Sequence, residues 1–227
     1  YAKVMADLLN LPPQRIRIVP PAADPEFLKI PLARPGTPFR IGFLSRRSPA
    51  KGLDTLIEAF IILCRNGRGD ERLAVAGETG PFRQFWNRLR RRVADAGLAG
   101  RLEDGGEPDF QQKVDFLARC TVFCLPSRMQ EQRASACLEA LSAGLPVVTS
   151  AGGVAAEIIR ETAAGIPVPA DDPVRLASML RSLRDDTERR TALANAARRA
   201  AVLNFNPDLL VQMTETVYLD MMRTSHH

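Results

Sequence analysis

The chain has 227 residues, of which 45% are hydrophobic and 25% are charged. This balance is ordinary for a globular domain, and it excludes intrinsic disorder, a collagen-like repeat and a coiled coil. Basic residues outnumber acidic residues by 31 to 26, and nearly all of them are arginines because only four lysines occur. The rigid fork of arginine suits phosphate recognition, so the charge balance favours an anionic ligand.

Short apolar runs alternate with amphipathic stretches along the chain. The apolar runs predict strands at 15–19, 39–44, 72–76, 101–103, 121–125, 146–149 and 166–168. Apolar residues at helical spacing predict helices near 51–65, 81–96, 110–119, 135–142, 154–161, 173–184, 187–203 and 208–222. Strands that are apolar throughout and joined by helices indicate a parallel sheet covered on both faces. Right-handed crossovers then give a doubly wound, Rossmann-like α/β domain with extra C-terminal helices.

The cysteines and histidines do not form a metal-binding pattern. No C-x-x-C pair occurs, and the histidines are His226 and His227 at the end of the chain, so no metal site is expected. Each cysteine lies in an apolar stretch, which predicts four buried small hydrophobic residues. A reducing, cytoplasmic setting agrees with this usage.

Common catalytic and nucleotide-binding motifs are also missing. The sequence has no G-x-G-x-x-G after its first sheet strand, no P-loop, no G-x-S-x-G, no D-x-D and no internal histidine base. In a doubly wound sheet, ligands bind beyond the carboxyl ends of the strands. The loops that follow predicted strands are therefore the candidates for a binding site: 45–52, 77–81, 104–108, 126–134 and 150–154.

The loop 45–52 carries two cations, Arg46 and Lys51, between a strand and the amino terminus of a helix. The unpaired amides and the helix dipole favour an anion there, and the two side chains would make a pocket suited to a diphosphate. Such a pocket would also stabilise a diphosphate that gains charge as a leaving group. A solvated basic turn is the alternative.

Two carboxylates, Glu131 and Glu139, flank the amino end of the helix predicted at 135–142. Each carboxylate can accept hydrogen bonds from a pair of sugar hydroxyls, and the amides between them can bind phosphate. Two hydroxyl-bearing groups joined through phosphate are the outline of a nucleotide sugar. Ordinary helix charges are the alternative.

Arginines also gather on the helix predicted at 81–96, in the run 88–92. A solvated face is the ordinary interpretation, and contact with anionic lipid or nucleic acid is the alternative. Aromatic residues are not interleaved with these arginines, which argues against a stacking platform for single strands. We interpret Trp86 as a packing residue of this helix.

Together, these loops resemble the carboxy-terminal half of retaining, family-four-type glycosyltransferases of the GT-B fold. The likeness covers residues 15–205. Residues 15–27, RIRIVPPAADPEF, are similar to the segment that leads into the family's second domain, and 41–60, IGFLSRRSPAKGLDTLIEAF, to its phosphate-loop stretch. Residues 101–107, RLEDGGE, resemble the segment that lines the nucleobase, and Glu131 and Glu139 have the E-x7-E spacing.

The resemblance implies a role for each matching residue. Arg46 and Lys51 would bind the donor diphosphate and neutralise it as it leaves, in place of a metal ion. Glu131 would hold the hydroxyls of the transferred sugar and Glu139 those of the ribose. The remaining implied donor contacts are Gly77, Glu103, Gly105, Arg133, Ala134 and Ser135.

The sequence departs from the family pattern near two of these positions. Ser45 stands where the family usually has glycine before its phosphate-loop arginine, and 132–134 read Gln-Arg-Ala where small or aromatic residues including glycine are usual. Glycine permits close approach of backbone to ligand, so Ala134 restricts it. Arg133 would add a phosphate contact.

The resemblance also implies how the chain is organised. Residues 1–37 would be a leading segment and linker from a missing N-terminal domain, 38–205 the nucleotide-sugar-binding domain, and 206–224 a C-terminal helix. The last residues, 225–227, read Ser-His-His and are similar to the remnant of a purification tag. The implied activity is metal-independent, configuration-retaining transfer of a sugar from a nucleotide diphosphate to an acceptor hydroxyl. No cofactor is implied, because the nucleotide sugar is a substrate.

The missing domain would supply the acceptor site, so the fragment alone is expected to be inactive. Nucleic acid is not an expected partner, and peripheral membrane contact would come through the full-length protein. The alternatives are a non-catalytic sugar-nucleotide-binding or regulatory domain of the same fold, and a basic surface that binds nucleic acid or anionic membrane.

Overall fold

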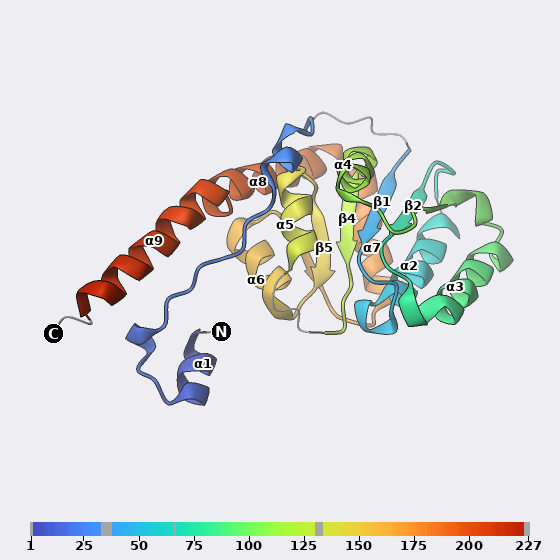
Figure 1. Cartoon of the computed structure of the whole chain (residues 1–227). Coiled ribbons are helices and arrows are strands. Elements are labelled where there is room, and N and C mark those ends of the chain that lie inside the picture. The colour runs from blue at the N-terminus through green and yellow to red at the C-terminus, as the bar shows by residue number, and fades with distance from the viewer. Residues whose placement is uncertain (1, 33–37, 66, 130–133, 225–227) are drawn as a thin grey trace.

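The computed structural model describes residues 2–32, 38–65, 67–129 and 134–224, and within them a parallel sheet of six strands forms the centre (Figure 1). The strands are β1 (Arg40–Leu44), β2 (Arg72–Ala76), β3 (Leu102–Asp104), β4 (Val122–Leu125), β5 (Val147–Ser150) and β6 (Gly165–Val168). Their order in the sheet is β3-β2-β1-β4-β5-β6. The order reverses between β1 and β4, so a topological switch point lies between these two strands.

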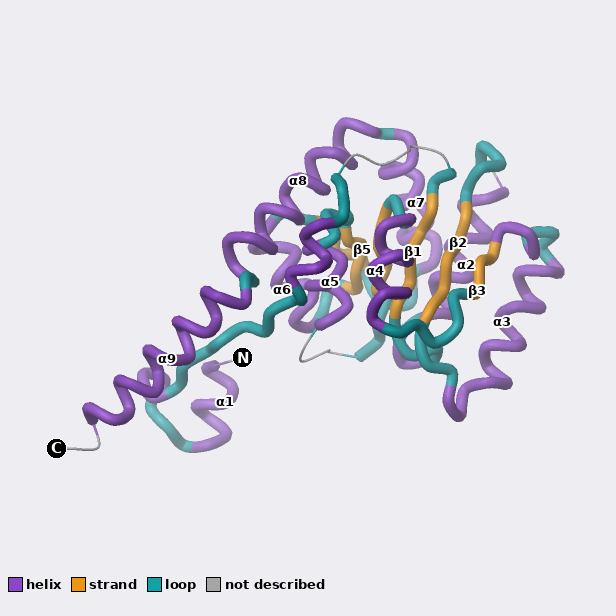
Figure 2. Tube along the Cα trace, turned by 45° about the horizontal axis from the view of Figure 1, so that its top comes forward, coloured by secondary structure: helices purple, strands orange, loops and turns teal. Residues whose placement is uncertain are grey.

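Helices cover both faces of the sheet (Figure 2). The described helices are α1 (Ala2–Leu9), α2 (Leu53–Arg65), α3 (Arg83–Asp95), α4 (Phe110–Arg119), α5 (Ser135–Ser142), α6 (Gly153–Thr162), α7 (Pro173–Asp185), α8 (Thr187–Asn204) and α9 (Pro207–Thr224), of which α1 and α9 lie away from the sheet (Figure 1). One buried apolar cluster joins α2, α3 and α7 to one face, and another joins α4, α5, α6 and α8 to the other. Because side chains alternate along a strand, Phe123 packs in one cluster and Cys124 in the other. The prediction of a doubly wound α/β domain is confirmed.

Aspartates fix the starts of three helices. Asp109 and Gln112 form a capping box at α4, in which the Asp109 carboxylate accepts from the backbone N–H of Gln112 at 2.8 Å. Asp172 caps α7 and Asp186 caps α8 in the same way. These caps satisfy backbone donors that a helix otherwise leaves without partners.

The amino-terminal edge of the sheet holds a closed charge cluster around Glu71, which directly precedes β2. Glu71 is 0% exposed. Its carboxylate pairs with Arg184 of α7 at 2.5 Å and with Arg101 at 3.4 Å, and it accepts backbone hydrogen bonds from Arg68 and Gly69. Burial alone would raise the pKa of Glu71, but these hydrogen bonds outweigh it and lower the pKa below its ordinary value. The charge at this edge is thus neutralised within the fold.

The cysteines are packed as small hydrophobic residues. Cys120, Cys124 and Cys137 are buried, and Cys64 on α2 is half-buried. Burial raises the pKa of the Cys64 thiol to about 11. The prediction is confirmed for the three buried cysteines, and Cys64 packs only against the edge of a core cluster.

The strand predicted at 15–19 is wrong. Pro13–Arg15 form a short 3-10 turn, and the residues after it are extended but pair with no strand among the described residues. Ile18 is 57% exposed, so the apolar run lies outside the core. Prolines on both sides lack the N–H that a sheet ladder needs, which explains why the run stays single.

The first and last helices, α1 and α9, lie on the same side of the domain, away from the sheet (Figure 1). Figure 1 shows α9 extending beyond the domain on the side where α1 lies. Residues 33–37 of the predicted leading segment and linker, and the predicted tag remnant at 225–227, lie outside the described residues. None of the described helices combines the length and apolar character that crossing a bilayer requires.

Candidate functional site

The loop after β1 brings its two cations to the switch point. Ser45 continues from β1, Arg46 is exposed, and Pro49–Lys51 form a 3-10 turn that leads into α2. Gly52 ends this turn with φ +68°, and a Cβ there would lie 1.8 Å from the carbonyl oxygen of Pro126. Glycine is required at this position because the loops after β1 and β4 touch there.

Arg128 fastens the loop after β4 to its surroundings. Its guanidinium contacts Asp54 at 2.7 Å and Asp171 at 2.5 Å, and its backbone N–H donates to the carbonyl of Ala50 at 2.9 Å. Hydrogen bonding to Asp54 is the main reason that the pKa of Arg128 is raised. The residue therefore ties together the loops after β1 and β4 and the loop before α7.

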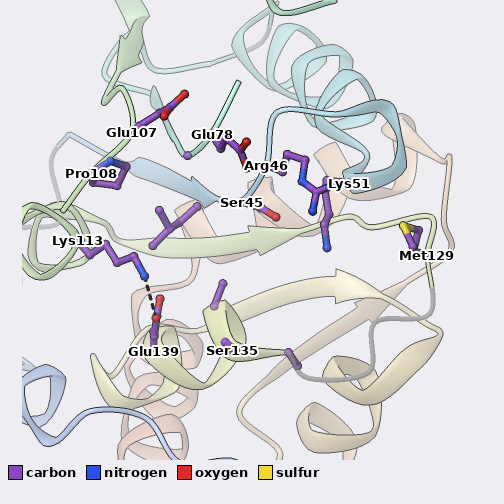
Figure 3. Close-up of a pocket in the computed structure, with 14 residues that line it drawn as sticks. Ser45, Arg46, Lys51, Glu78, Glu107, Pro108, Lys113, Met129, Ser135 and Glu139 are labelled. Atoms are coloured by element: carbon purple, nitrogen blue, oxygen red, sulfur yellow. Dashed lines mark hydrogen bonds and ion pairs between the residues drawn. The ribbon is translucent and has the colours of Figure 1, made fainter. Parts of the chain in front are cut away.

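Glu139 enters the site from α5. Its carboxylate is 3.2 Å from Nζ of Lys113 on α4 (Figure 3). Burial raises the pKa of Glu139 above its ordinary value even though Lys113 acts in the opposite direction. Ala134, just before α5, has φ +49°, a left-handed conformation that an alanine adopts only with strain.

These elements surround one open cavity of about 800 Å³. Figure 3 shows Glu107 and Pro108 at one end, Met129 at the other, and Arg46 and Lys51 between them. The lining residues are Leu44, Ser45, Arg46, Lys51, Gly77, Glu78, Glu107, Pro108, Lys113, Met129, Ala134, Ser135, Ala136 and Glu139. Cations therefore face the same cavity as a carboxylate that can accept hydrogen bonds from hydroxyl groups. This arrangement can hold an anion joined to a hydroxyl-bearing group.

Gly77, which follows β2, lies in close backbone contact with the loops after β1 and β3. Its φ is +126°, and a Cβ there would be 2.1 Å from the carbonyl oxygen of Ser45. Its N–H donates to the carbonyl of Gly106 at 2.7 Å. Gly77 therefore joins the loop after β1 to the loop after β3 by backbone contact alone.

The structure brings together Arg46, Lys51, Gly77, Ala134, Ser135 and Glu139 of the residues predicted from sequence. It places Glu103 elsewhere: this side chain lies within β3, and its carboxylate forms a bidentate pair with Arg40 at the amino-terminal part of β1. Gly105 packs against Ala76 and is not part of the cavity lining. Glu131 and Arg133 lie outside the described residues.

Sequence reasoning missed Lys113, Glu107 and Glu78. Lys113 lies one turn inside α4, where nothing in the local pattern distinguishes it from a surface lysine. Glu107 and Glu78 follow β3 and β2, and their position after a strand was the only available signal. In the described residues, no group of three or more histidines, cysteines or carboxylates lies close enough to hold a metal ion.

Comparison with known proteins relates this geometry to a family. A family model described as "Glycosyl transferases group 1" matches residues 24–200. A D-inositol 3-phosphate glycosyltransferase from Acidothermus cellulolyticus is 28% identical over 97% of this chain and 51% of its own length. The lipopolysaccharide core biosynthesis mannosyltransferase LpsB from Rhizobium meliloti is 30% identical over 81% of this chain and 52% of its own length. The chain spans about half the length of these curated relatives.

Solved structures agree in fold. Anabaena Alr3699/HepE in complex with UDP superposes with a TM-score of 0.81 and 18% identity, covering 97% of this chain and 61% of that one. The C-terminal domain of a group 1 glycosyl transferase, LpcC from Francisella tularensis, superposes with a TM-score of 0.69 and 23% identity, covering 84% of this chain and 97% of that one. This likeness shows a shared Rossmann-like fold.

Proposed function

Because the chain belongs to the group 1 glycosyl transferases, whose GT-B fold its sheet matches, we propose that it is the donor-binding domain of a sugar-transferring enzyme. Its ligand is a nucleotide diphosphate sugar. Anabaena HepE has been solved with UDP and with UDP-glucose, which supports this class of ligand. The single observation that carries the proposal is the cavity at the switch point, where two cations and a half-buried carboxylate face the same space.

The cations bind the diphosphate. Arg46 and Lys51 line the cavity at the start of α2, where backbone N–H groups and the helix dipole also favour negative charge. When the sugar leaves, the departing diphosphate gains charge, and two fixed cations stabilise that charge without a metal ion. Arg46 and Lys51 therefore contribute to catalysis as well as to binding.

The carboxylates bind hydroxyls. Glu139 accepts hydrogen bonds from the ribose, and Lys113 holds its carboxylate in place. Glu131 binds the hydroxyls of the sugar that is transferred. Ser135, at the start of α5, and Ala134 line the floor between the two ends of the ligand.

The nucleobase lies at the end of the cavity formed by the loop after β3. Glu107 and Pro108 line that end, on the far side of the cations from Met129 (Figure 3). In this arrangement Glu107 and Pro108, rather than Glu103, are the residues of the 101–108 segment that face the base. Glu103 instead supports β3 through its pair with Arg40.

Transfer proceeds with retention of configuration, and the acceptor binds to a further domain of the full-length protein. The domain described here binds the donor and does not transfer sugar alone. Residues 38–205 are the nucleotide-sugar-binding domain, and 206–224 are the C-terminal helix that follows it.

Isothermal titration calorimetry of the chain with UDP, GDP, UDP-glucose and GDP-mannose tests this proposal. At least one of the four should bind, and Arg46→Ala should weaken it. Absence of binding to all four, or multiple turnovers of sugar transfer by this chain alone, would overturn the proposal. In the full-length protein, Glu131→Ala separates an enzyme, which loses transfer, from a non-catalytic sugar-nucleotide-binding domain.

A further inference from the structure

The loop after β3 forms a thin wall at one end of the donor cavity. Residues 104–107 are all exposed. Glu107 lines the donor cavity on one side and a second cavity of about 450 Å³ on the other. A loop that is open on two sides has little packing to hold it, so hydrogen bonds must fix its position.

Some of these bonds come from backbone groups: Gly77 N–H donates to the carbonyl of Gly106, Gly105 N–H to that of Val75, and Thr79 N–H to Glu107 Oε1 at 3.0 Å. The bonds from buried side chains converge on the Asp104 carboxylate. Arg47 Nη2 donates to Asp104 Oδ1 at 2.7 Å and to the carbonyl of Gly106 at 2.9 Å. The indole Nε1 of Trp86 donates to Asp104 Oδ2 at 3.1 Å. The Arg47 guanidinium in turn lies over the Trp86 ring, 4.7 Å from its centroid. Side chains from the loop after β1 and from α3 thus hold both oxygens of one carboxylate.

Arg47 connects the loop after β1, to which it belongs, with the loop after β3. It directly follows Arg46, it is 3% exposed, and its own N–H donates to the carbonyl of Glu78 at 2.8 Å. Its Nε is buried with no hydrogen-bond partner in the described part of the chain. A buried donor without a partner costs stability, so this arrangement is not the one that stability alone would favour.

We propose that Arg47, Asp104 and Trp86 form a positioning clamp, which holds the loop 105–108 at a fixed distance from the cations of the loop 45–52. None of the three needs to touch the donor, because they act through Gly106, Glu107 and Pro108. The inference rests on the proposed function, in which the diphosphate contacts one loop and the nucleobase the other. The clamp therefore controls affinity for the nucleoside part of the donor and leaves affinity for the diphosphate part unchanged.

The ratio of nucleotide affinity to pyrophosphate affinity tests the clamp. Dissociation constants for UDP, for GDP and for inorganic pyrophosphate are measured by calorimetry for the parent chain and for Asp104→Asn. Loss of the charged carboxylate should raise the dissociation constant of the more tightly bound nucleotide, UDP or GDP, about tenfold. The dissociation constant of pyrophosphate should change by less than about twofold. Trp86→Phe keeps the buried ring but loses its N–H, and should shift the same ratio about threefold.

Glu58→Gln is the matched control. It removes the charge from the pair in which Arg92 Nε of α3 contacts Glu58 Oε1 of α2 at 2.7 Å. This arginine–carboxylate pair does not touch the loop. Its nucleotide-to-pyrophosphate ratio should equal that of the parent. A role in folding alone would lower the melting temperature of the Asp104 and Trp86 variants without moving the ratio.

The outcomes separate the clamp from the proposed function. If the parent binds nucleotide and both clamp variants keep its ratio, the clamp is overturned and the proposed function stands. If both ligands weaken equally, the clamp is overturned as well. If the parent binds neither UDP nor GDP, the clamp is overturned, and the proposed function fails with it only if UDP-glucose and GDP-mannose do not bind either. If Asp104→Asn does not fold, Trp86→Phe decides the question.

Discussion

The two edges of the sheet use charged residues in opposite ways. At the amino-terminal edge, Glu71 is fully buried and is matched by Arg184, Arg101 and two backbone N–H groups. At the carboxyl edge, Arg46 is exposed and Glu139 faces a cavity of about 800 Å³. The first cluster is complete within the fold, whereas the second leaves room for a ligand.

The pKa values of the two carboxylates follow this difference. Hydrogen bonds lower the pKa of Glu71 despite its burial, whereas burial raises the pKa of Glu139 despite the nearby Lys113. A carboxylate whose pKa the fold lowers contributes stability when ionised, and one whose pKa the fold raises costs stability when ionised. The charged groups of the two edges should therefore respond to mutation in opposite ways.

The largest expected effect is on folding, at Glu71. Glu71→Gln removes the buried carboxylate that pairs with Arg184 and Arg101, and leaves Asp185 as the remaining carboxylate partner of Arg184. It should lower the free energy of unfolding by about 3 kcal/mol at neutral pH. Since the pKa of Glu71 is lowered, its contribution is present above the ordinary value of 4.5 and disappears as the pH falls through the folded-state pKa. Urea unfolding at several pH values measures this.

Nucleotide affinity of the folded Glu71→Gln protein should stay unchanged. A variant as stable as the parent at neutral pH would show that the buried cluster is not what holds this edge together.

The next effect is on binding, at Arg46. Arg46→Ala should weaken nucleotide diphosphate binding by about 1.5–3 kcal/mol, because a charge-assisted hydrogen bond is lost, and should change stability by less than about 0.5 kcal/mol. Calorimetry and thermal unfolding give the two values. Arg88→Ala is the control: it removes the same charge from α3, where Arg88 lies over the Phe85 ring. Equal weakening by both variants would mean that net charge, and not the site, determines affinity.

The smallest effect is expected at Glu139. The direction in which its contribution to stability changes with pH is opposite to that of Glu71. Glu139→Gln should weaken nucleotide binding by about 1.5 kcal/mol, because a charged acceptor for hydroxyls is lost. Since the pKa of Glu139 is raised, its ionisation favours the unfolded chain, so the parent should lose stability relative to the variant as the pH rises above 4.5. Unfolding of both proteins at pH 4 and pH 7 measures this, and a parent that gains stability relative to Glu139→Gln over this range would contradict the assignment.

Much of this architecture was readable from the sequence. The run 122–125 is apolar at every position, as a strand buried on both faces requires, and β4 lies there. The cations Arg46 and Lys51 were found because a strand ends immediately before them. Position relative to the end of a strand was therefore the main signal for the predicted residues that the structure brings to one cavity.

The remainder depended on contacts between distant segments. Glu103 and Glu107 look alike in the sequence, but β3 includes the first and ends before the second, and a three-residue strand has no alternation to reveal its ends. The contact of Lys113 with Glu139 joins α4 to α5, and it exists only once β4 is inserted beside β1. Trp86 was interpreted as a packing residue. It is buried, but its N–H also binds Asp104, which helical spacing could not indicate.

The burial of the native thiols has a practical consequence for measuring donor binding. Cysteine reagents attack the thiolate, so three enclosed sulfurs and a fourth with a pKa near 11 should label very slowly at neutral pH. Met129 is 56% exposed at the rim of the cavity. A fluorophore attached through Met129→Cys would thus report occupancy of the cavity against a silent background, with all four natural cysteines left in place.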